Sequence, residues 1–223
     1  MADEAINPTG SELEFTGERV VPGQVDADLW NEHYARYLFA SRFARGERVL
    51  DLGCGAGYGA ALLAETAAAV TGVDVSAEAA EYARAHYPRA NLQFQQASCT
   101  ATGLPDASFD LITAFEIIEH LDDWQKLLEE ARRLLAPDGQ FMVSTPNKSY
   151  YDQARELAGA NPYHVHEFEF GEFEAALRAV FPSVSLFTQN HADTAVFQPL
   201  VVNGAAELKM ASTAADPPGA HFF

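Results

Sequence analysis

Two stretches of this chain combine residue types and spacings that suit chemistry. The first is VLDLGCGAGYG at residues 49–59, in which an apolar run breaks at Gly53, Gly55 and Gly57 and leads into helix-forming residues. A strand that turns through glycines into a helix lets backbone N–H groups approach a ligand closely. About 20 residues later, Asp74 ends a second apolar run, where a carboxylate can accept hydrogen bonds from both hydroxyls of a ribose. The pattern predicts a site for a nucleoside-containing cofactor.

Asp51 narrows the choice of cofactor. The spacing of Gly55, Gly57 and Ala60 formally satisfies the G-x-G-x-x-G/A fingerprint of nicotinamide enzymes. That interpretation would leave the Asp51 carboxylate facing a diphosphate, whereas an acid at this strand end is better matched to a cation. The methionine part of S-adenosylmethionine carries an ammonium and a sulfonium group. We therefore favour S-adenosylmethionine and keep a nicotinamide-dependent oxidoreductase as a distant alternative.

The second stretch is FEIIEHL, which gives Glu116, Glu119 and His120 in an E-x-x-E-H pattern after a fourth predicted strand. These positions share one face if the segment forms a helical turn. Further along, NPYHVHEFEF holds His164 and His166, which point the same way if that segment is extended. We expect an acid and histidine cluster at the functional end of the fold.

Two interpretations of this cluster stay open. Glu116, Glu119, His120 and His164 could together hold a divalent cation, and a carboxylate-rich set suits magnesium or manganese. Without a metal, His120 or His164 is the candidate general base, because histidine can accept a hydroxyl proton near neutral pH. The choice between His164 and His166 is not decided by spacing. The purely structural alternative is that the carboxylates bind neighbouring backbone or arginine groups and that the histidines pack in the core or cap a helix.

Composition limits the class of protein. The chain has 223 residues, enough for one domain with a small lid or tail, and a formal net charge of −18. That charge repels phosphate backbones, so a nucleic-acid partner is disfavoured. Two cysteines make no disulfide framework. The N-terminus lacks the features of a signal peptide, and no apolar stretch is long enough to span a bilayer, so we expect a cytoplasmic protein.

Predicted strands alternate with helices along the chain, which indicates βαβ units. We therefore expect an α/β, Rossmann-like, doubly wound fold with a mostly parallel sheet of about seven strands, the last one short or truncated. Residues 1–28 are expected to form an arm or lid, residues 29–190 the cofactor-binding domain, and residues 191–223 a tail that completes the sheet edge. The expected helices cover residues 29–44, 57–68, 77–88, 122–139 and 166–181, and the expected strands cover residues 47–53, 69–76, 91–97, 108–118, 140–147 and 183–190. Glu129, Glu130, Arg132 and Arg133 are expected on a solvated helix face.

The run of motifs VLDLGCGAGYG, GVDVS, FDLITAFEIIEHL and LLAPDGQFMVSTPN resembles class I S-adenosylmethionine-dependent methyltransferases over residues 48–187. The resemblance implies that Asp51, Gly53, Gly55 and Gly57 line the methionine moiety. It also implies roles around the nucleoside: Asp74 holds the ribose, Val75 packs on the adenine, Ser98 and Cys99 lie at the adenine edge, and Phe115 borders the cofactor. Where the family often has an acidic residue, this chain has Gln-Ala-Ser-Cys.

The N-terminal arm has a resemblance of its own. FTGERVVPGQ followed by NEHYARYLFA is similar to an entry segment in methyltransferases of glycan and nucleotide-sugar pathways. The resemblance implies a lid over the cofactor, with Tyr34 and Arg36 facing the site and Arg36 or Arg19 pairing with the cofactor carboxylate. An E-x-x-E-H motif at this place also occurs in ubiquinone-pathway O-methyltransferases and small-RNA 2′-O-methyltransferases, where metal binding is associated with it.

We therefore expect methyl transfer from S-adenosylmethionine to a hydroxyl oxygen of a small metabolite, such as a sugar or a natural-product intermediate, with S-adenosylhomocysteine as product. The alternatives are metal-assisted RNA 2′-O-methylation, N-methylation of a small molecule, and a cofactor-binding subunit without turnover. The sequence leaves the acceptor and the oligomeric state open.

Overall fold

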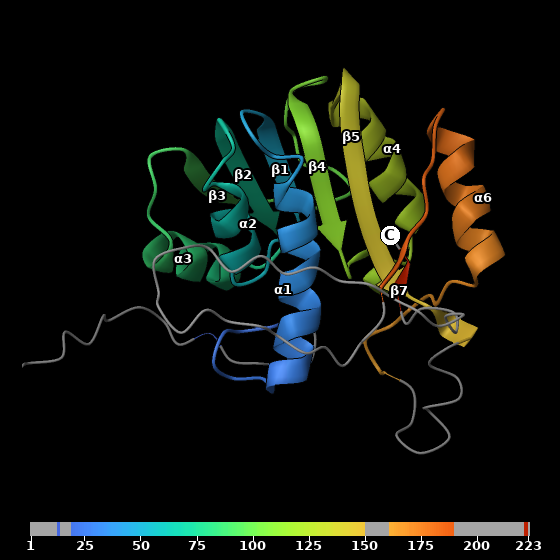
Figure 1. The fold of residues 1–223 in the computed structure, drawn as a ribbon, viewed down its shortest axis with the longest axis horizontal. Coiled ribbons are helices and arrows are strands. Elements are labelled where there is room, and N and C mark those ends of the chain that lie inside the picture. The colour runs from blue at the N-terminus through green and yellow to red at the C-terminus, as the bar shows by residue number, and fades with distance from the viewer. Residues whose placement is uncertain (1–12, 14–18, 150–160, 190–220, 223) are drawn as a thin grey trace, which may run out of the picture.

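The computed structural model describes residues 13, 19–149, 161–189 and 221–222. Five parallel strands form the centre of the sheet: β1 (Arg48–Leu52), β2 (Ala69–Asp74), β3 (Leu92–Gln96), β4 (Phe109–Phe115) and β5 (Leu135–Pro146). Two strands of two residues, β6 (Thr188–Gln189) and β7 (His221–Phe222), extend it, giving the order β3-β2-β1-β4-β5-β7-β6 (Figure 1). Strand order reverses beside β1, which is where open α/β sheets bind ligands.

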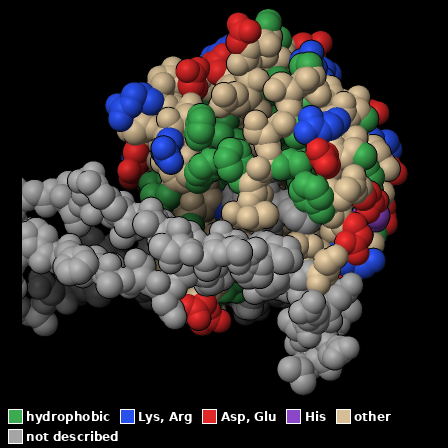
Figure 2. Space-filling model, turned by 45° about the vertical axis from the view of Figure 1, so that its right-hand side comes forward, with side chains coloured by type: hydrophobic (Ala, Val, Ile, Leu, Met, Phe, Trp, Pro, Cys, Tyr) green, Lys and Arg blue, Asp and Glu red, His purple; other side chains and the backbone are tan. Residues whose placement is uncertain are grey.

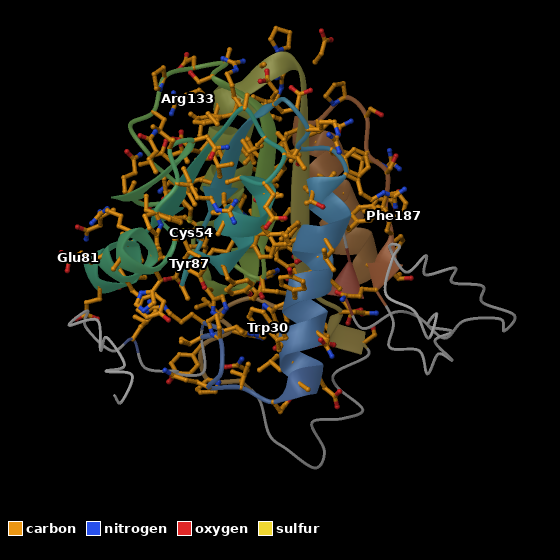
Figure 3. All side chains as sticks on the ribbon, turned by 60° about the vertical axis from the view of Figure 1, so that its left-hand side comes forward. Trp30, Cys54, Glu81, Tyr87, Arg133 and Phe187 are labelled. Carbon is orange, nitrogen blue, oxygen red and sulfur yellow. The ribbon has the colours of Figure 1, made fainter. Side chains whose placement is uncertain are left out.

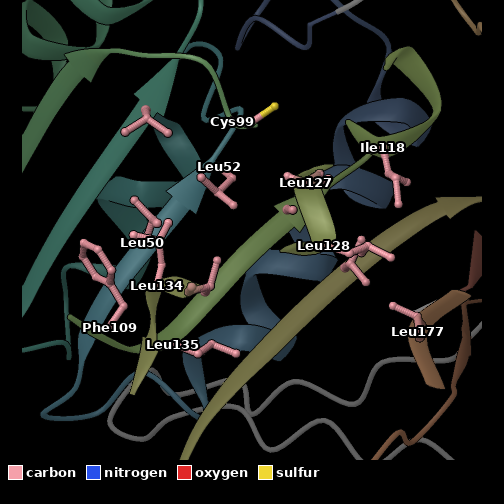
Figure 4. Packing of buried hydrophobic residues seen from close by; sticks show 14 of the residues in the cluster. Leu50, Leu52, Cys99, Phe109, Ile118, Leu127, Leu128, Leu134, Leu135 and Leu177 are labelled. Carbon is pink, nitrogen blue, oxygen red and sulfur yellow. The ribbon is translucent and has the colours of Figure 1, made fainter. Parts of the chain in front are cut away.

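Helices cover both faces of the sheet. Residues of α1 (Ala27–Ser41), α2 (Tyr58–Leu63) and α3 (Ala77–His86) share one buried cluster with the strands. Residues of α4 (Trp124–Leu134) and α6 (Phe170–Val180) share a second cluster, drawn in part in Figure 4. In β1, Val49 belongs to the first cluster and Leu50 to the second, and both are fully buried. A strand covered on both faces must be apolar on both, as parallel strands usually are.

The α/β architecture is as expected, but the expected strand count is met only in part. Five strands are parallel, and β7 pairs antiparallel with β5 at Thr145 and Pro146 and with β6 at Thr188 and Gln189. Within the sheet, β7 lies between β5 and β6. The rest of the predicted tail, residues 191–220 and 223, and residues 1–12 and 14–18 of the predicted arm lie outside the described residues.

Several predicted helix boundaries were wrong, among them the end of the helix predicted over residues 57–68, which ends at Leu63. The helix predicted to begin at residue 29 begins at Ala27, where the Asp26 side chain accepts a hydrogen bond from the Leu29 N–H as an N-cap. The helix predicted over residues 122–139 ends at Leu134, because Leu135 is already extended and pairs with Phe109. The next pair joins residues 111 and 140, so residues 136–139 form a bulge in β5 that accommodates the Pro-Asp-Gly turn sequence.

The helix predicted from residue 166 begins only at Phe170, after extended residues. No helix among the described residues combines the length and apolar character that crossing a membrane requires.

The predicted solvated face of α4 also needs a correction. Glu130 is buried, and its carboxylate accepts hydrogen bonds from the Thr102 N–H at 2.8 Å and the Thr102 hydroxyl at 2.6 Å. Arg133 donates to the same carboxylate at 2.7 and 2.8 Å and to the Leu104 carbonyl. The hydrogen bonds from Arg133 and Thr102 lower the pKa of Glu130 to about 2. The Glu130 carboxylate therefore fastens the loop after β3 to α4.

Candidate functional site

The predicted site residues gather at the carboxyl ends of the parallel strands. Figure 3 shows Trp30, near the start of α1, at this end of the molecule, and Arg133 at the opposite end. The glycine loop turns here through positive φ angles of 70° at Gly53, 52° at Gly55 and 87° at Gly57. A Cβ atom at Gly57 would lie 2.5 Å from the Ala83 Cβ. The turn therefore needs glycine both for its backbone angles and for its close contact with α3.

Asp74 links the glycine loop to the end of β2. One of its carboxylate oxygens accepts a hydrogen bond from the Gly55 N–H at 2.9 Å, and the other accepts one from the Ser76 N–H at 2.9 Å. Each carboxylate oxygen can accept a second hydrogen bond. Asp74 is thus held by the backbone in the position that the sequence predicts for ribose recognition.

Asp51 is a fully buried carboxyl group at the end of β1. The Tyr37 hydroxyl lies 3.2 Å from both of its carboxylate oxygens, and the Thr113 hydroxyl donates to one of them at 2.7 Å. Burial nevertheless raises the pKa of Asp51 to about 7, and the negative charge of Asp74 adds to the rise. A cation close to such a carboxyl group would lower its pKa, because the cation favours the ionised form.

Glu116 and Arg36 form an ion pair at the end of β4. The Arg36 guanidinium is almost completely buried, with its Nη2 atom 3.6 Å from a Glu116 carboxylate oxygen. The Ser144 hydroxyl donates to the other Glu116 oxygen at 2.7 Å. Glu116 has a φ of 53°, a left-handed conformation that is uncommon for residues other than glycine. It therefore does not share a helical turn with Glu119 and His120, and that part of the predicted E-x-x-E-H geometry is wrong.

Glu119 lies in the short 3-10 helix η1 (Ile118–His120) and is buried. The Thr145 hydroxyl donates to its Oε2 atom at 3.1 Å, whereas its buried Oε1 atom has no hydrogen-bond partner among the described residues. Burial raises the pKa of Glu119 well above its usual value, and the nearby charge of Glu116 adds to the effect. The backbone carbonyl of Glu119 accepts hydrogen bonds from the Val165 and His166 N–H groups, which fixes the later segment against η1.

His120 and His164 come together, with ring centroids 5.1 Å apart. The Nδ1 atom of His120 lies 2.9 Å from the Tyr163 carbonyl, which can only accept, so Nδ1 carries the proton. The Nε2 atom of His120 then offers its lone pair and lies 4.0 Å from Glu119 Oε1. This geometry leaves His120 able to accept a proton on Nε2.

His164 has partners at both ring nitrogens. Its Nδ1 atom donates to the Glu167 carboxylate at 3.2 Å, and its Nε2 atom accepts from the Asn161 side-chain amide at 3.0 Å. The orientation of that amide follows from its oxygen, which accepts from the Tyr163 N–H. In this tautomer both ring nitrogens of His164 already have a hydrogen-bond partner, and the lone pair on Nε2 is the one that accepts from Asn161.

His166 does not join the cluster. Its Nε2 atom lies 2.9 Å from a Glu172 carboxylate oxygen on α6, and its ring packs near Trp124 and Phe168. The expectation that His164 and His166 point the same way is wrong, because the segment from Asn161 to Phe168 contains turns rather than a regular extended strand.

The remaining predicted cofactor residues divide by exposure. Val75 is 71% exposed, so its side chain is open to a ligand. Ser98 is half-buried and bonds the Thr100 hydroxyl, but Cys99 is buried within a hydrophobic cluster, where burial raises the pKa of its thiol to about 11. Phe115 is buried against the Tyr37 ring. At the predicted cofactor edge, Ser98 is therefore accessible, whereas the Cys99 side chain is not.

The residues predicted to form the lid differ in what they contact. Tyr34 stacks on Trp30 with ring centroids 5.3 Å apart, and Trp30 also contacts the Tyr58 ring at 4.8 Å. Arg36 points to Glu116, as described above, whereas Arg19 lies beside Gly55, its Cβ atom 3.7 Å from where a Gly55 Cβ would be. Of the two arginines proposed to meet a cofactor carboxylate, Arg19 is the one at the glycine loop.

Sequence reasoning missed several residues that support the site. Thr113 is the register partner of Asp51, and its hydroxyl in an otherwise apolar strand was a detectable signal. Ile117 lies against Gly53, 2.9 Å from where a Cβ would be, and so joins the cofactor loop to η1. Asn161 and Glu167 orient His164, and no local sequence pattern predicted these contacts.

Known proteins are similar to this chain in sequence and in fold. A family described as a methyltransferase domain matches residues 50–143. A probable S-adenosylmethionine-dependent methyltransferase of Mycolicibacterium smegmatis is 37% identical over 172 residues, which cover 77% of this chain and 66% of that protein. A ubiquinone biosynthesis O-methyltransferase of Actinobacillus pleuropneumoniae is 33% identical over 137 residues, 56% of this chain and 58% of that protein. The YcgJ protein from Bacillus subtilis has a crystal structure that aligns with a TM-score of 0.59 at 30% identity, over 66% of this chain and 68% of that one.

These similarities agree with the site geometry described above. The chain spans at most about two thirds of the length of the two curated relatives, at 66% and 58%. The matched region includes the glycine loop, Asp74 and the segment through His120. The chain therefore belongs to the S-adenosylmethionine-dependent methyltransferases, with its methyltransferase domain over residues 50–143.

Proposed function

We propose that this protein transfers a methyl group from S-adenosylmethionine to a hydroxyl oxygen of a small metabolite, and that His120 is the general base. The observation that carries the proposal is the lone pair that His120 Nε2 offers in η1, the element that directly follows Ile117, whose side chain contacts Gly53 of the glycine loop. The O-methyltransferase name of the Actinobacillus relative supports an oxygen acceptor. The net charge of −18 supports a small acceptor over RNA.

The cofactor would lie along the glycine loop. Asp74 would accept hydrogen bonds from the ribose hydroxyls, Asp51 would attract the ammonium group, and exposed Val75 would contact the adenine. Arg19, beside Gly55, would meet the cofactor carboxylate. The Ile117 side chain, which contacts Gly53, would then lie between the sulfonium group of the cofactor and η1.

The sulfonium methyl is already activated, so catalysis depends mainly on alignment of the acceptor oxygen with the methyl–sulfur bond. As the oxygen forms its new bond to the methyl carbon, the methyl–sulfur bond breaks and S-adenosylhomocysteine leaves. The acceptor proton passes to His120 Nε2. The resulting imidazolium would lie 4.0 Å from Glu119 Oε1, and its positive charge would favour the ionised form of that buried carboxyl group. The Tyr163 carbonyl would hold the ring in the required tautomer throughout.

A divalent cation does not fit this arrangement. Glu119, His120 and His164 bring ligand atoms within 4.8 Å of one another. However, both His164 nitrogens are engaged by Glu167 and Asn161, and Glu116 is held by Ser144 and Arg36. Among the described residues two donors remain, Glu119 Oε1 and His120 Nε2, which is fewer protein ligands than magnesium or manganese sites with this chemistry usually use. The proposed mechanism therefore uses no metal.

The test combines a methyl-labelled cofactor with a panel of sugars, other hydroxylated metabolites, small amines and RNA. Label is expected on a hydroxyl oxygen of a small molecule. His120→Gln is expected to lower kcat at least about 100-fold with little change in cofactor affinity. His166→Gln is the matched control, because the His166 ring nitrogen bonds Glu172 on α6 rather than a member of the His120 and His164 pair, and this variant should keep normal turnover.

The other outcomes decide against the proposal. Label confined to amines would show an N-methyltransferase, and label on RNA would show a nucleic-acid enzyme. Cofactor binding without turnover on any acceptor class would favour a non-catalytic subunit. Full activity in His120→Gln would remove His120 from the role of base.

A further inference from the structure

Tyr37 is an inward-facing residue of α1 that reaches the end of β1. Figure 2 shows hydrophobic side chains exposed on one face of the molecule, and Leu38 of α1, 48% exposed, is among the exposed apolar residues. Tyr37, the residue before it, is only 6% exposed and belongs to the buried cluster between α1, α2 and the strands. Its hydroxyl lies 3.2 Å from each oxygen of the Asp51 carboxyl group. Helix α1 therefore contacts the carboxyl group that we assign to the cofactor ammonium.

Gly59 gives the Tyr37 ring its passage to Asp51. A Cβ atom at Gly59 would lie 2.1 Å from Cζ and 2.2 Å from Cε1 of Tyr37. Gly59 is a residue of α2 with no left-handed backbone angle, and alanine favours a helix more than glycine does. The missing Cβ therefore serves the contact with the ring. Phe115 and Tyr58 pack edge-on against the same ring, with centroids 5.0 and 5.6 Å away, and hold it in place.

The hydrogen bonds to the ionised Asp51 leave one position open. Burial raises the pKa of Tyr37 well above its usual value, and the negative charge of Asp51 adds to the rise, so the phenol keeps its proton and donates it. The Thr113 hydroxyl donates to Oδ1 of Asp51 at 2.7 Å. Oδ1 thus has two donors among the described residues and Oδ2 has one, whereas a carboxylate oxygen can accept two. The open position on Oδ2 suits an ammonium group.

The other ionisable groups around Asp51 do not favour its charged form. Cys54 in the glycine loop and Tyr58 in α2 are buried, and burial raises the pKa of each well above its usual value, so both stay neutral. The negative charge of Asp74, at the end of β2, raises the pKa of Asp51. The hydrogen bonds from Thr113 and Tyr37 lower it. The ionised form of Asp51 therefore depends on these two hydroxyl groups.

We propose that Tyr37 is a positioning residue for the cofactor, whose hydroxyl holds the Asp51 carboxylate in the ionised form that binds the ammonium group. This inference rests on the contact between Asp51 and the ammonium that the proposed function includes. Arg36, the preceding residue of α1, pairs with Glu116 at the end of β4. With two successive residues, α1 thus holds two carboxyl groups of the site, and it contributes to cofactor recognition as well as covering the sheet.

The experiment measures the affinity for S-adenosylhomocysteine, which keeps the ammonium group but has no methyl to transfer, by calorimetry from pH 6 to pH 8.5. Tyr37→Phe keeps the ring and removes the hydroxyl. Loss of one hydrogen bond to a carboxylate should raise the pH at which Asp51 ionises by about one pH unit. Relative to wild type, binding should be about ninefold weaker at pH 6, about fivefold weaker at pH 7 and within about 1.5-fold at pH 8.5. Comparing the proteins at each pH cancels the titration of the ligand's own amine.

Two further variants and a second ligand sharpen the test. Gly59→Ala keeps the tyrosine but displaces its ring, so it should weaken binding most at low pH, as Tyr37→Phe does. Tyr87→Phe is the matched control, because the hydroxyl groups bonded to Asp51 are those of Tyr37 and Thr113, and it should bind as wild type does at every pH. Adenosine, which lacks the ammonium group, should bind Tyr37→Phe and wild type equally.

The possible failures are distinguishable. Equal binding of S-adenosylhomocysteine to Tyr37→Phe and wild type at pH 6, together with weak binding to Asp51→Asn, would overturn the inference and leave the ammonium contact standing. A loss of the same size at every pH, or an equal loss for adenosine, would show a merely structural role for Tyr37 and would also overturn it. Unchanged binding to Asp51→Asn would remove the ammonium contact from the proposed function, and this inference with it.

Discussion

The substitution Asp51→Asn should make the fold more stable at neutral pH while it weakens cofactor binding. Asp51 is fully buried, and its pKa is about 7 in the folded protein against 3.8 as a free side chain. Between these values the folded protein keeps a proton that the unfolded chain has lost, so stability falls as pH rises. A difference of about 3 units corresponds to about 4 kcal/mol, of which about 3 kcal/mol is lost between pH 5 and pH 8.

Asparagine keeps the shape of the side chain and an oxygen that can accept from Thr113 and Tyr37, but it does not ionise. Urea unfolding of both proteins from pH 5 to pH 8, at constant ionic strength, measures the effect. The stability of Asp51→Asn relative to wild type should grow by about 3 kcal/mol over this range. Asp110→Asn is the control: Asp110 pairs with Arg48, which lowers its pKa, so this variant should lose stability with no growth above pH 5.

Cofactor affinity should change in the opposite direction. An ammonium group beside Asp51 favours the ionised carboxylate, so affinity for S-adenosylmethionine should rise with pH and level off above about 7. Adenosine, which has no ammonium group, should show no such dependence, and Asp51→Asn should abolish it. A stability difference that is flat with pH, or an Asp51→Asn protein that is less stable at pH 8, would refute the reasoning.

Three further predictions follow from the same geometry. Gly57→Ala should destabilise the fold by about 3 kcal/mol or more in urea unfolding, because its Cβ would clash with Ala83, whereas Gly23→Ala, with φ of 82° and open space, should cost only about 1 kcal/mol. Glu130→Gln should lower the free energy of unfolding by about 2 kcal/mol at pH 7. This loss should shrink as the pH falls below 4.5 toward about 2, because the lowered pKa of Glu130 contributes stability only while the carboxylate is ionised. A loss independent of pH would contradict the pairing with Arg133. Exhaustive treatment with a chelator should leave methyl transfer unchanged, and recovery of lost activity by magnesium or manganese would contradict the metal-free mechanism.

The parts of the site that depend on adjacent residues could be predicted from the sequence. The glycine turn and the position of Asp74 follow from a strand, a tight turn and the end of the next strand, so local pattern sufficed. The burial of Asp51 followed less directly, because it requires Tyr37 from α1 and Thr113 from β4 to close over it. Those partners come from distant parts of the chain, and only the fold brings them together.

Elsewhere tertiary contacts overruled the local pattern. Glu116 leaves the expected helical turn because Ser144 and Arg36 hold it in a left-handed conformation. His164 and His166 separate because their segment turns between η1 and α6, each ring finding a different acid. The bulge before residue 140 results from the pairing of β5 with β4, and the helical pattern of α4 does not predict it.

The double hydrogen bond to the Glu119 carbonyl ties η1, which contains His120, to Val165 and His166, beyond the residues 50–143 that match the methyltransferase-domain family. Under the proposed function, a substitution that loosens this attachment should alter turnover while it leaves the affinity for S-adenosylmethionine unchanged, because the glycine loop and Asp74 are not part of the attachment.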